Sequence, residues 1–393
     1  MTIDVERARR ETPGCANVLH FNNAGAALMP VSVLAATTDY LALESQVGGY
    51  EAAGREAAVL ERVYTASAEL LGCDPDEIAF VETATRAWDM AFYALLFAPG
   101  DRILTARAEY ASNVVAFLQV AAKTGAVVEV IPSDETGQLS VAALREMIDE
   151  RVKLIAITHV PTNGGLVNPA AAIGKIAREA GITYLLDACQ SVGQMPIDVR
   201  DIGCDILTTA GRKYLRGPRG TGLLYIRREL YQALEPPFLD DHAATWVAPN
   251  RYEIRDDARR FENWETNFAG KVGLGVAIDY AQGWGLEAIW DRVQTLAAAL
   301  RDGLAAIPGV AVRDIGAELC GIVTFTIDGS DAGEIKRSLA ARTMNVTVSS
   351  VASTRFDMEA RGLRNVMRAS VHYYNDENEV ERFCAAVRAI AAS

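Results

Sequence analysis

Apolar runs of six to eight residues alternate with helical patterns between about residues 54 and 228. Several runs are nearly continuous in Val, Ile and Leu, which is typical of strands covered on both faces of a parallel sheet. Helical patterns of three or four turns lie between them, for example at 113–124 and at 169–180. The alternation predicts an α/β domain around a mostly parallel sheet of seven strands. The expected strands are 77–82, 102–107, 127–132, 153–160, 183–189, 206–211 and 221–227.

The alternation ends after Arg227, where Glu235-Pro236-Pro237 interrupts the chain and an aromatic, charged loop continues to Phe268. A long helical pattern then covers about 270–307 and ends at Pro308-Gly309. The remainder predicts a small C-terminal α+β domain with the order strand, strand, helix, strand, helix. We therefore expect an N-terminal arm at 1–20, a large domain at 21–268, and a connecting helix with the small domain at 269–393.

The charge balance excludes one broad class of function. The 393 residues contain 38 Lys and Arg against 51 Asp and Glu, a formal net charge of -13, which repels nucleic acid and anionic membranes. The N-terminus has no apolar signal segment, and no run approaches the ~18 apolar residues of a membrane helix. The six cysteines form no C-x-x-C pair, so the sequence predicts a cytoplasmic protein with reduced thiols.

The most informative segment is 182–228. The strand ITYLLDACQ carries Asp187 near its end, at the sheet edge where open α/β folds bind ligands. A second strand follows and leads into GRKYLRGPRGTG, which contains Lys213 among small residues. A lysine desolvated in this way can stay neutral enough to attack a carbonyl group.

The same segment holds an island of positive charge. No acid occurs between Gly211 and Arg228, a pattern that attracts a phosphate or a carboxylate or forms a solvated basic loop. Its basic residues are Arg212, Lys213, Arg216, Arg219, Arg227 and Arg228.

Eight motifs in the same order resemble the class V aminotransferase family of pyridoxal-phosphate (PLP) enzymes, which includes cysteine desulfurases, isopenicillin N epimerase-like proteins and carbon–sulfur lyases. The resemblance implies PLP fold type I, the aspartate aminotransferase-like architecture, and pyridoxal 5'-phosphate as cofactor. The motifs are HFNNAGAALMP, FVETATRAWDMAF, AEYASN, THVPTNGGLVNP, LLDACQSVGQMPIDV, TTAGRKYLRGPRGTGLLY, FENWETN and VMRASVHYYN.

The resemblance implies the catalytic roles. Lys213 is expected to form the Schiff base with the cofactor, and Asp187 to pair with the pyridine nitrogen so that the ring acts as an electron sink. Gln190 is similar to the residue that hydrogen-bonds the phenolic oxygen of the cofactor.

Other residues are expected to hold the phosphate and the ring. Ala84 and Thr85 lie where a strand leads into a helix, so their N–H groups can bind phosphate, although Thr85 could be an ordinary N-cap. Tyr110 occupies the place of a stacking aromatic residue, with core packing as the alternative. Arg212 could contact the phosphate, and Thr209 or Thr208 could supply a hydroxyl.

Substrate binding is expected from three further segments. Arg368 matches the arginine that binds the substrate α-carboxylate. Asn23, Ala24 and Gly25 resemble a segment that folds over the substrate, and Asn163 lies near the face of the ring. Thr266 corresponds to a residue that reaches the phosphate of the other subunit. A homodimer with the active site at the subunit interface is therefore expected.

The reaction type is predicted from an absence. Desulfurases of this family accept sulfur on a loop cysteine that precedes the strand of the carboxylate-binding arginine. The corresponding stretch VTVSSVASTRFDMEARGLRN has no cysteine, and Ser353 occupies roughly the matching place. The segment SQVGGYEAAG is similar to lyases that cut cysteine conjugates and sulfoxides. We therefore expect β-elimination from a cysteine conjugate or sulfoxide, with an aminotransferase or epimerase as the alternative and a desulfurase as unlikely.

Rival classes lack their motifs. No G-x-G-x-x-G follows a strand, and no G-x-x-x-x-G-K-[ST] occurs. The four histidines are too scattered to predict a metal site. A non-enzymatic binding module is disfavoured because Asp187, Lys213 and Arg368 are all retained.

Overall fold

The seven predicted strands form one sheet. The computed structural model describes residues 2–392 and orders the strands β2-β8-β7-β6-β5-β3-β4. β8 pairs antiparallel with both of its neighbours, and the pairs from β7 to β4 are parallel, so the predicted fold class is confirmed. The strands are β2 (Ile78–Val81), β3 (Arg102–Thr105), β4 (Val127–Val130), β5 (Val152–Thr158), β6 (Thr183–Asp187), β7 (Ile206–Ala210) and β8 (Gly222–Ile226).

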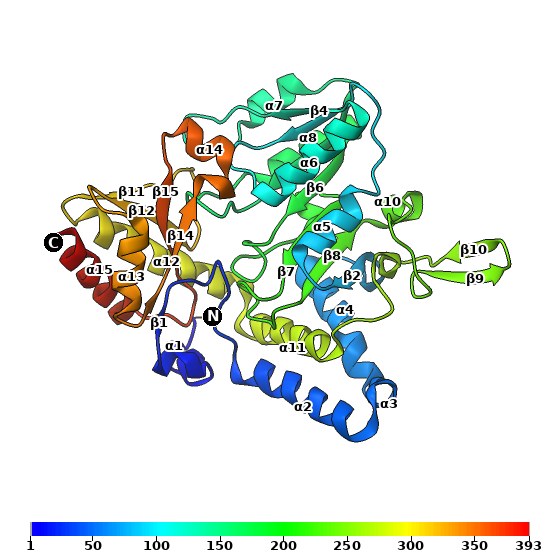
Figure 1. Cartoon of the computed structure of the whole chain (residues 1–393), viewed down its shortest axis with the longest axis horizontal. Coiled ribbons are helices and arrows are strands. Elements are labelled where there is room, and N and C mark those ends of the chain that lie inside the picture. The colour runs from blue at the N-terminus through cyan, green and yellow to red at the C-terminus, as the bar shows by residue number, and fades with distance from the viewer. Residues whose placement is uncertain (1, 393) are drawn as a thin grey trace.

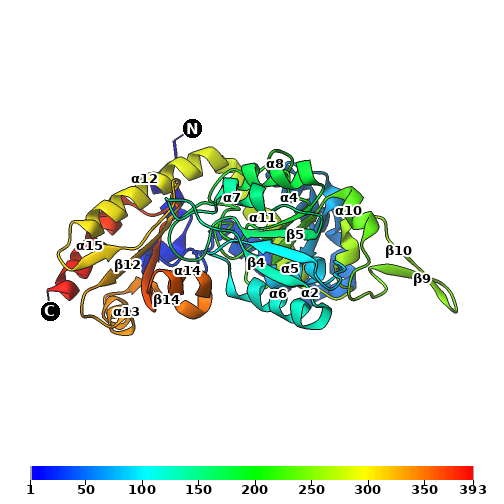
Figure 2. The same cartoon turned by 90° about the horizontal axis from the view of Figure 1, so that it is seen from above.

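Helices cover both faces of this sheet, as the continuous apolar strands require. Successive residues of β5 show the division, since Leu154 packs into one apolar cluster and Ile155 into the other. Figure 2 shows α7 and α8 on one side of the sheet and α6 on the other. The first face is covered by α4 (Ala57–Leu71), α7 (Val141–Met147), α8 (Ala170–Ala180) and α11 (Phe268–Trp284), and the second by α5 (Ala84–Phe92), α6 (Ala111–Thr124) and α10 (Arg228–Ala233).

A second, four-stranded antiparallel sheet lies beside the seven-stranded sheet and its helices (Figure 1). Its strand order is β11 (Val310–Val312), β12 (Ile322–Ile327), β15 (Asn365–Ser370) and β14 (Thr347–Ser350). It packs with α12 (Leu286–Ala305), α13 (Ala332–Ala340) and α15 (Glu377–Ala391). Near the N-terminus, α1 (Val5–Arg10) precedes β1 (Leu19–His20), which pairs with β13 (Met344–Asn345). The predicted domain boundaries, between residues 20 and 21 and between residues 268 and 269, stay predictions.

Two expectations about elements are wrong. The helical pattern at 270–307 forms two helices, because Gly285 between α11 and α12 has a φ of +85°, which a continuous helix cannot contain. The expected loop up to Phe268 contains a hairpin of β9 (Ala244–Ala248) and β10 (Arg251–Ile254) that projects from the molecule in Figure 1.

The other short elements connect these layers. The remaining helices are α2 (Val31–Val47), α3 (Gly49–Arg55), α9 (Val199–Ile202) and α14 (Arg355–Ala360), and the 3-10 turns are Pro13–Ala16, Pro75–Glu77, Ala258–Phe261 and Val351–Ser353. Within residues 2–392, no helix has the length and apolar character needed to cross a bilayer. The six cysteines are free thiols.

Candidate active site

The candidate site lies at the carboxyl ends of the parallel strands. Asp187 is the last residue of β6, where it pairs in register with Thr158 of β5 and Thr208 of β7. Lys213 follows three residues after the end of β7, in a turn. Ligands in open α/β sheets bind at this edge, so the strand order itself brings the predicted acid and the predicted lysine together.

The Lys213 amine lies among charged neighbours but makes no hydrogen bond or ion pair with another described residue. Burial lowers the pKa of its amine, while the nearby Cys189 and Asp187 favour the charged form. The cations of Arg212 and Arg368 also lower this pKa. A desolvated lysine near other cations is the arrangement that makes an amine nucleophilic.

Asp187 is held by two donors. Its Oδ2 accepts a hydrogen bond from Asn113 Nδ2 at 3.0 Å, and its Oδ1 accepts one from the backbone N–H of Cys189 at 2.9 Å. The residue is 5% exposed. A carboxylate accepts up to about four hydrogen bonds, so Asp187 retains capacity for a protonated ring nitrogen.

A second buried carboxylate, Glu109, is linked to Asp187 through Asn113. Glu109 accepts hydrogen bonds from Asn113 Nδ2 at 2.8 Å, from the Thr158 hydroxyl at 2.5 Å and from the Thr105 hydroxyl at 3.1 Å. Two backbone N–H groups, of Tyr110 and Thr158, also donate to it. Asn113 therefore donates to both acids and fixes their relative position. Burial raises the pKa of Glu109 to about 7, with a smaller contribution from the charge of Asp187.

The start of α5 forms a small backbone cradle. The N-cap is Thr83, whose hydroxyl accepts from Arg86 N, so the N-cap interpretation of Thr85 is wrong. A Cβ atom at Gly222 of β8 would lie 2.9 Å from the nitrogen of Ala84, which shows how closely the two backbones approach. Neither the N–H of Ala84 nor that of Thr85 has a partner among residues 2–392. Such free N–H groups at a helix start bind phosphate.

Arg368 is a buried cation without a carboxylate partner. It lies in the middle of β15, is 7% exposed, and its Nη1 donates to the hydroxyl of Thr162 at 2.5 Å and to the Thr162 carbonyl at 3.3 Å. Its Nε has no partner among the described residues. Burial lowers the pKa of the guanidinium to about 10. A buried guanidinium surrounded by neutral partners is suited to an anionic substrate group.

The N-terminal segment reaches this site through Ala24. Gln190 Nε2 donates to the Ala24 carbonyl at 3.0 Å, and the buried Gln190 Oε1 has no partner in the described chain. Ala24 N donates to the hydroxyl of Ser370 at 2.9 Å, and Gly25 N closes a turn onto Asn22. Asn23 is fully engaged in structural bonds: its amide donates to Ser370 O at 2.7 Å and its oxygen accepts from the Tyr374 hydroxyl.

Asn163 and Tyr110 lie in different environments. Asn163 is buried, its amide donates to the Thr354 hydroxyl at 2.9 Å, and its Oδ1 has no described partner. Tyr110, the N-cap of α6, is 39% exposed, so the core-packing alternative is wrong. Its phenol lies close enough to Arg368 to raise the pKa of that guanidinium.

The basic island does not act as one unit. Arg216 is fully buried, where it donates to Leu28 O and lies 4.4 Å from the ring centroid of Tyr374. Arg227 and Arg228 form ion pairs with nearby acids, and the charge of Arg212 lowers the pKa of Lys213. The Thr209 hydroxyl donates to the Ala188 carbonyl at 3.3 Å, so its single proton is not free for a phosphate.

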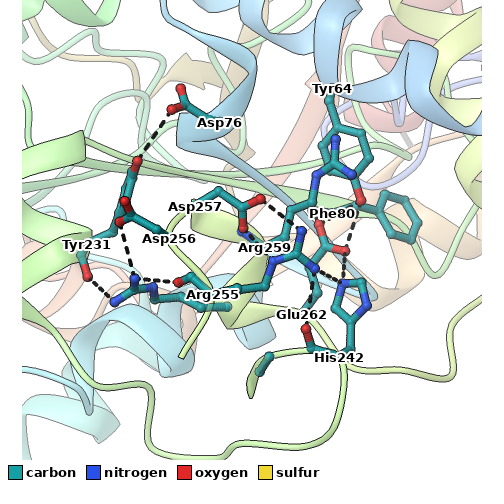
Figure 3. A network of polar contacts seen from close by, with 12 residues as sticks. Tyr64, Asp76, Phe80, Tyr231, His242, Arg255, Asp256, Asp257, Arg259 and Glu262 are labelled. Atoms are coloured by element: carbon teal, nitrogen blue, oxygen red, sulfur yellow. Dashed lines mark hydrogen bonds and ion pairs between the residues drawn. The ribbon is translucent and has the colours of Figure 1, made fainter. Parts of the chain in front are cut away.

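Thr266 belongs to a segment held by a buried network. It borders a pocket of about 210 Å³ that Tyr50, His242 and Lys271 also line. In Figure 3, Glu262 lies between Tyr64 and His242. The Glu262 carboxylate accepts from the Tyr64 hydroxyl at 2.9 Å and from Phe80 N at 2.8 Å. This network fixes the chain just before Thr266 against β2.

Sequence reasoning missed three positioning residues, Glu109, Asn113 and Thr162. The first two belong to the quoted motif AEYASN, where Glu and Asn four residues apart at a helix start was an available signal. Thr162 has no such signal, because its role depends on a contact with Arg368, 206 residues away in the chain.

The residues present fit PLP. The free N–H groups of α5 suit the phosphate, and the spare acceptor capacity of Asp187 suits the protonated ring nitrogen. The unpartnered Gln190 side chain suits the phenolic oxygen, and the Lys213 amine suits the aldehyde carbon.

Comparison with known proteins places the chain in a family. The model for Aminotransferase class-V matches residues 19–383. A probable cysteine desulfurase of Methanothermobacter thermautotrophicus is 29% identical over 385 residues, covering 96% of this chain and 95% of the relative. One of Xylella fastidiosa strain 9a5c is 32% identical, covering 98% and 95%. The apo structure of cysteine desulfurase from Thermococcus onnurineus NA1 has 27% identity and a TM-score of 0.93, covering 100% and 99%.

The fold is that of the PLP-dependent enzymes of fold type I. The chain belongs to the class V aminotransferase family, as the motifs predict, and PLP as cofactor is confirmed at the level of the family.

The predicted reaction is wrong. The relatives are named cysteine desulfurases, which contradicts both the preference for a carbon–sulfur lyase acting on conjugates and the exclusion of a desulfurase. The exclusion relied on one loop position, whereas the similarity extends over nearly the whole chain.

Glu109 gives a prediction about pH. The folded-state pKa of Glu109, about 7, is raised above the usual 4.5 of a glutamate, so the folded protein holds this proton more tightly than the unfolded chain does. The contribution of Glu109 to stability is therefore present below pH 4.5 and is lost as the pH rises from 4.5 through 7. The difference in unfolding free energy between wild type and Glu109→Gln should therefore decrease from pH 5 to pH 8, by up to roughly 3 kcal/mol. Chemical denaturation at several pH values measures it.

Glu129→Gln is the matched control. The hydrogen bond from Arg102 lowers the pKa of Glu129, so its difference from wild type should stay flat in this interval. A Glu109→Gln difference that grows with pH would contradict the assignment.

Proposed function

We propose that this chain is a PLP-dependent enzyme that removes the sulfur of cysteine and transfers it to a thiol. The proposal is based on the buried guanidinium of Arg368, which has no carboxylate partner in the described chain and lies close enough to Lys213 to lower the pKa of its amine. Arg368 can therefore hold an amino acid by its α-carboxylate beside the Lys213 amine. The names of the relatives support cysteine as the substrate.

Each side chain of the site has a separate role in the proposed reaction. PLP, when bound, supplies an electron sink for charge that develops at Cα, which no side chain offers. Asp187 would hold the ring nitrogen in its protonated form, and the N–H groups of Ala84 and Thr85 would hold the phosphate. Lys213, kept partly neutral by burial, would take a proton from Cα and return one. Tyr110 would cover the ring from the open side.

Sulfur transfer requires an acceptor that the loop lacks. A thiol attacks the substrate sulfur, the Cβ–S bond breaks, and protonation of Cβ gives alanine and a persulfide. Residues 346–364 contain no cysteine, and the Val351–Ser353 turn presents Ser353. Cys189 and Cys320 are buried, and burial raises the pKa of both thiols, which disfavours the nucleophilic thiolate. We therefore propose that the acceptor thiol comes from outside the chain.

The missing loop thiol also favours a second candidate. An aminotransferase needs Lys213, Asp187 and Arg368 but no acceptor thiol, so the cysteine-free segment 346–364 is compatible with amino transfer to a keto acid. The two candidates differ in co-substrate and product, and one assay separates them.

Product analysis with cysteine tests the proposal. Cysteine and dithiothreitol should give alanine, hydrogen sulfide and oxidised dithiothreitol in equal amounts, because the dithiol accepts the sulfur and then releases it as sulfide. Without the dithiol, alanine should form more slowly and no sulfide equivalent to it should appear, because cysteine itself is then the acceptor thiol and keeps the sulfur as a persulfide. Lys213→Ala should abolish the reaction, whereas Lys175→Ala, a control at another lysine, should leave it unchanged.

Each alternative product contradicts it. Pyruvate and ammonia in place of alanine would indicate β-elimination. Alanine or another amino acid formed only when a keto acid is added would assign the aminotransferase.

We further infer that the active unit is a homodimer. The hairpin of β9 and β10 carries Trp246, which is 77% exposed, and the exposed Tyr252, and Phe238 and Trp264 near its base are exposed as well. Exposed aromatic side chains in one region are typical of an interface. Thr266, on the segment beside them, would then contribute to the site of the partner.

Light scattering tests the dimer. The expected mass is twice the 42.4 kDa of the chain, and Trp246→Ser should shift the equilibrium toward the monomer, because it removes the largest exposed apolar surface of the hairpin. A wild-type species of 42.4 kDa at micromolar concentration would contradict the inference.

A further inference from the structure

The turn that carries Lys213 ends in a residue with an unusual backbone conformation. This turn, residues 211–216, is called the lysine turn below. Arg216 has a φ of +61°, which a residue with a Cβ atom rarely adopts, and its N–H donates to the Lys213 carbonyl at 2.9 Å. Among the described non-glycine residues, only Thr343 also has a positive φ. Such a conformation is unfavourable and persists only where surrounding contacts hold it.

The side chain of Arg216 makes these contacts. It is 1% exposed, and each of its three nitrogens donates to a different segment of the chain. Nε donates to the Leu28 carbonyl at 2.8 Å, Nη1 to the Tyr373 hydroxyl at 2.6 Å, and Nη2 to the Thr12 hydroxyl at 2.5 Å. The guanidinium forms no ion pair with a carboxylate of residues 2–392, so these neutral acceptors compensate for its burial.

The three acceptors belong to segments that also contribute to the candidate active site or precede it. Leu28 follows residues 23–25, which reach the site through Ala24. Tyr373 lies three residues after the end of β15, the strand that holds Arg368. The third acceptor belongs to the N-terminal arm. Arg216 therefore joins the lysine turn to the N-terminal segment and to the strand of the proposed substrate anchor.

The backbone on either side of Lys213 is bound to the same two segments. Ala27 N donates to the carbonyl of Arg212 at 3.0 Å, and His372 Nε2 donates to the carbonyl of Tyr214 at 2.9 Å. These are single hydrogen bonds to the two direct neighbours of the lysine. The three bonds of one rigid, planar guanidinium add the constraint that fixes the orientation of the whole turn.

We propose that Arg216 is a positioning residue for Lys213: its buried guanidinium holds the lysine turn against the N-terminal segment and β15, and so fixes the Lys213 amine relative to Arg368. The inference rests on the proposed role of Lys213 as the lysine that binds the cofactor. When the guanidinium is removed, the left-handed backbone of residue 216 loses its support. The turn then relaxes and the amine becomes better hydrated.

The pKa of the Lys213 amine reports this position. Burial is the largest cause of its shift, and the other groups that contribute are Cys189, Asp187, Arg212 and Arg368. Arg216 is not among these groups, so an Arg216 variant changes this pKa by moving the amine and not by removing a nearby charge. Hydration reverses the effect of burial and therefore raises the pKa.

Acetylation of the full-length protein at several pH values, measured by peptide mass spectrometry after removal of bound PLP, tests the proposal. In Arg216→Gln, the pH at which Lys213 reaches half of its maximal reactivity should rise by roughly 0.5–1 unit relative to wild type. Lys271 is the internal reference, because burial lowers its pKa as well and its amine donates to Tyr64, in a network without Arg216. The Lys271 profile should not move, whereas general loosening of the fold would move both profiles.

A milder double variant keeps Arg216 and removes two of its acceptors. Thr12→Val/Tyr373→Phe changes the side-chain volumes little and should shift the Lys213 profile in the same direction as Arg216→Gln. Thr124→Val/Tyr93→Phe is the matched control: it removes the same two hydroxyl groups at α6 and at the end of α5 and should leave the profile unchanged.

Three results overturn the proposal. They are an unchanged Lys213 profile in the Thr12→Val/Tyr373→Phe variant, an unchanged profile in a folded Arg216→Gln variant, and equal shifts of Lys213 and Lys271. If Arg216→Gln does not fold, the double variant decides alone. The acetylation contains no PLP, so a failure of this inference is distinguishable from a failure of the proposed function, which product analysis with cysteine tests.

Discussion

The buried carboxylate of Asp187 at the carboxyl end of β6 is the constraint on which the site depends. A charge removed from water must be compensated by hydrogen bonds and by an opposite charge. Asn113 and the N–H of Cys189 supply the hydrogen bonds, and Lys213 lies close enough for its charge to respond to Asp187. A protonated ring nitrogen would complete the compensation, so the acid, the amine and the cofactor form one electrostatic unit.

The parallel order of the strands explains how residues distant in the chain join this unit. Thr105, Thr158, Asp187 and Ala210 all end strands at the same edge, because βαβ connections return each strand in the same direction. Glu109 bonds two of these ends and Asn113. Arg368 comes from the other sheet through Thr162. The cofactor edge and the substrate anchor therefore come from two layers, and their relative position depends on how the layers pack.

The sequence predicted the fold better than the chemistry. Continuous apolar runs identify buried strands because period and length suffice for that decision, and all seven strands formed where expected. The break at Gly285 could not be decided from the pattern, because glycine is tolerated inside helices. Arg216 shows a different limit: its charge was attributed to a basic island, yet the side chain is buried among tyrosines, a contact that depends on the packing of residues more than 150 positions apart. The predicted reaction type was wrong because the prediction relied on one missing loop cysteine, whereas the similarity to cysteine desulfurases extends over nearly the whole chain.

Lys271 offers the sharpest comparison for the central assignment. Like Lys213 it is buried, and burial lowers the pKa of its amine, but its amine donates to the Tyr64 hydroxyl at 2.6 Å. Borohydride reduction of the PLP-loaded protein, followed by peptide mass spectrometry, identifies the lysine that carries the cofactor. We predict the pyridoxyl adduct on Lys213 alone. An adduct on Lys271, or on no lysine, would contradict it.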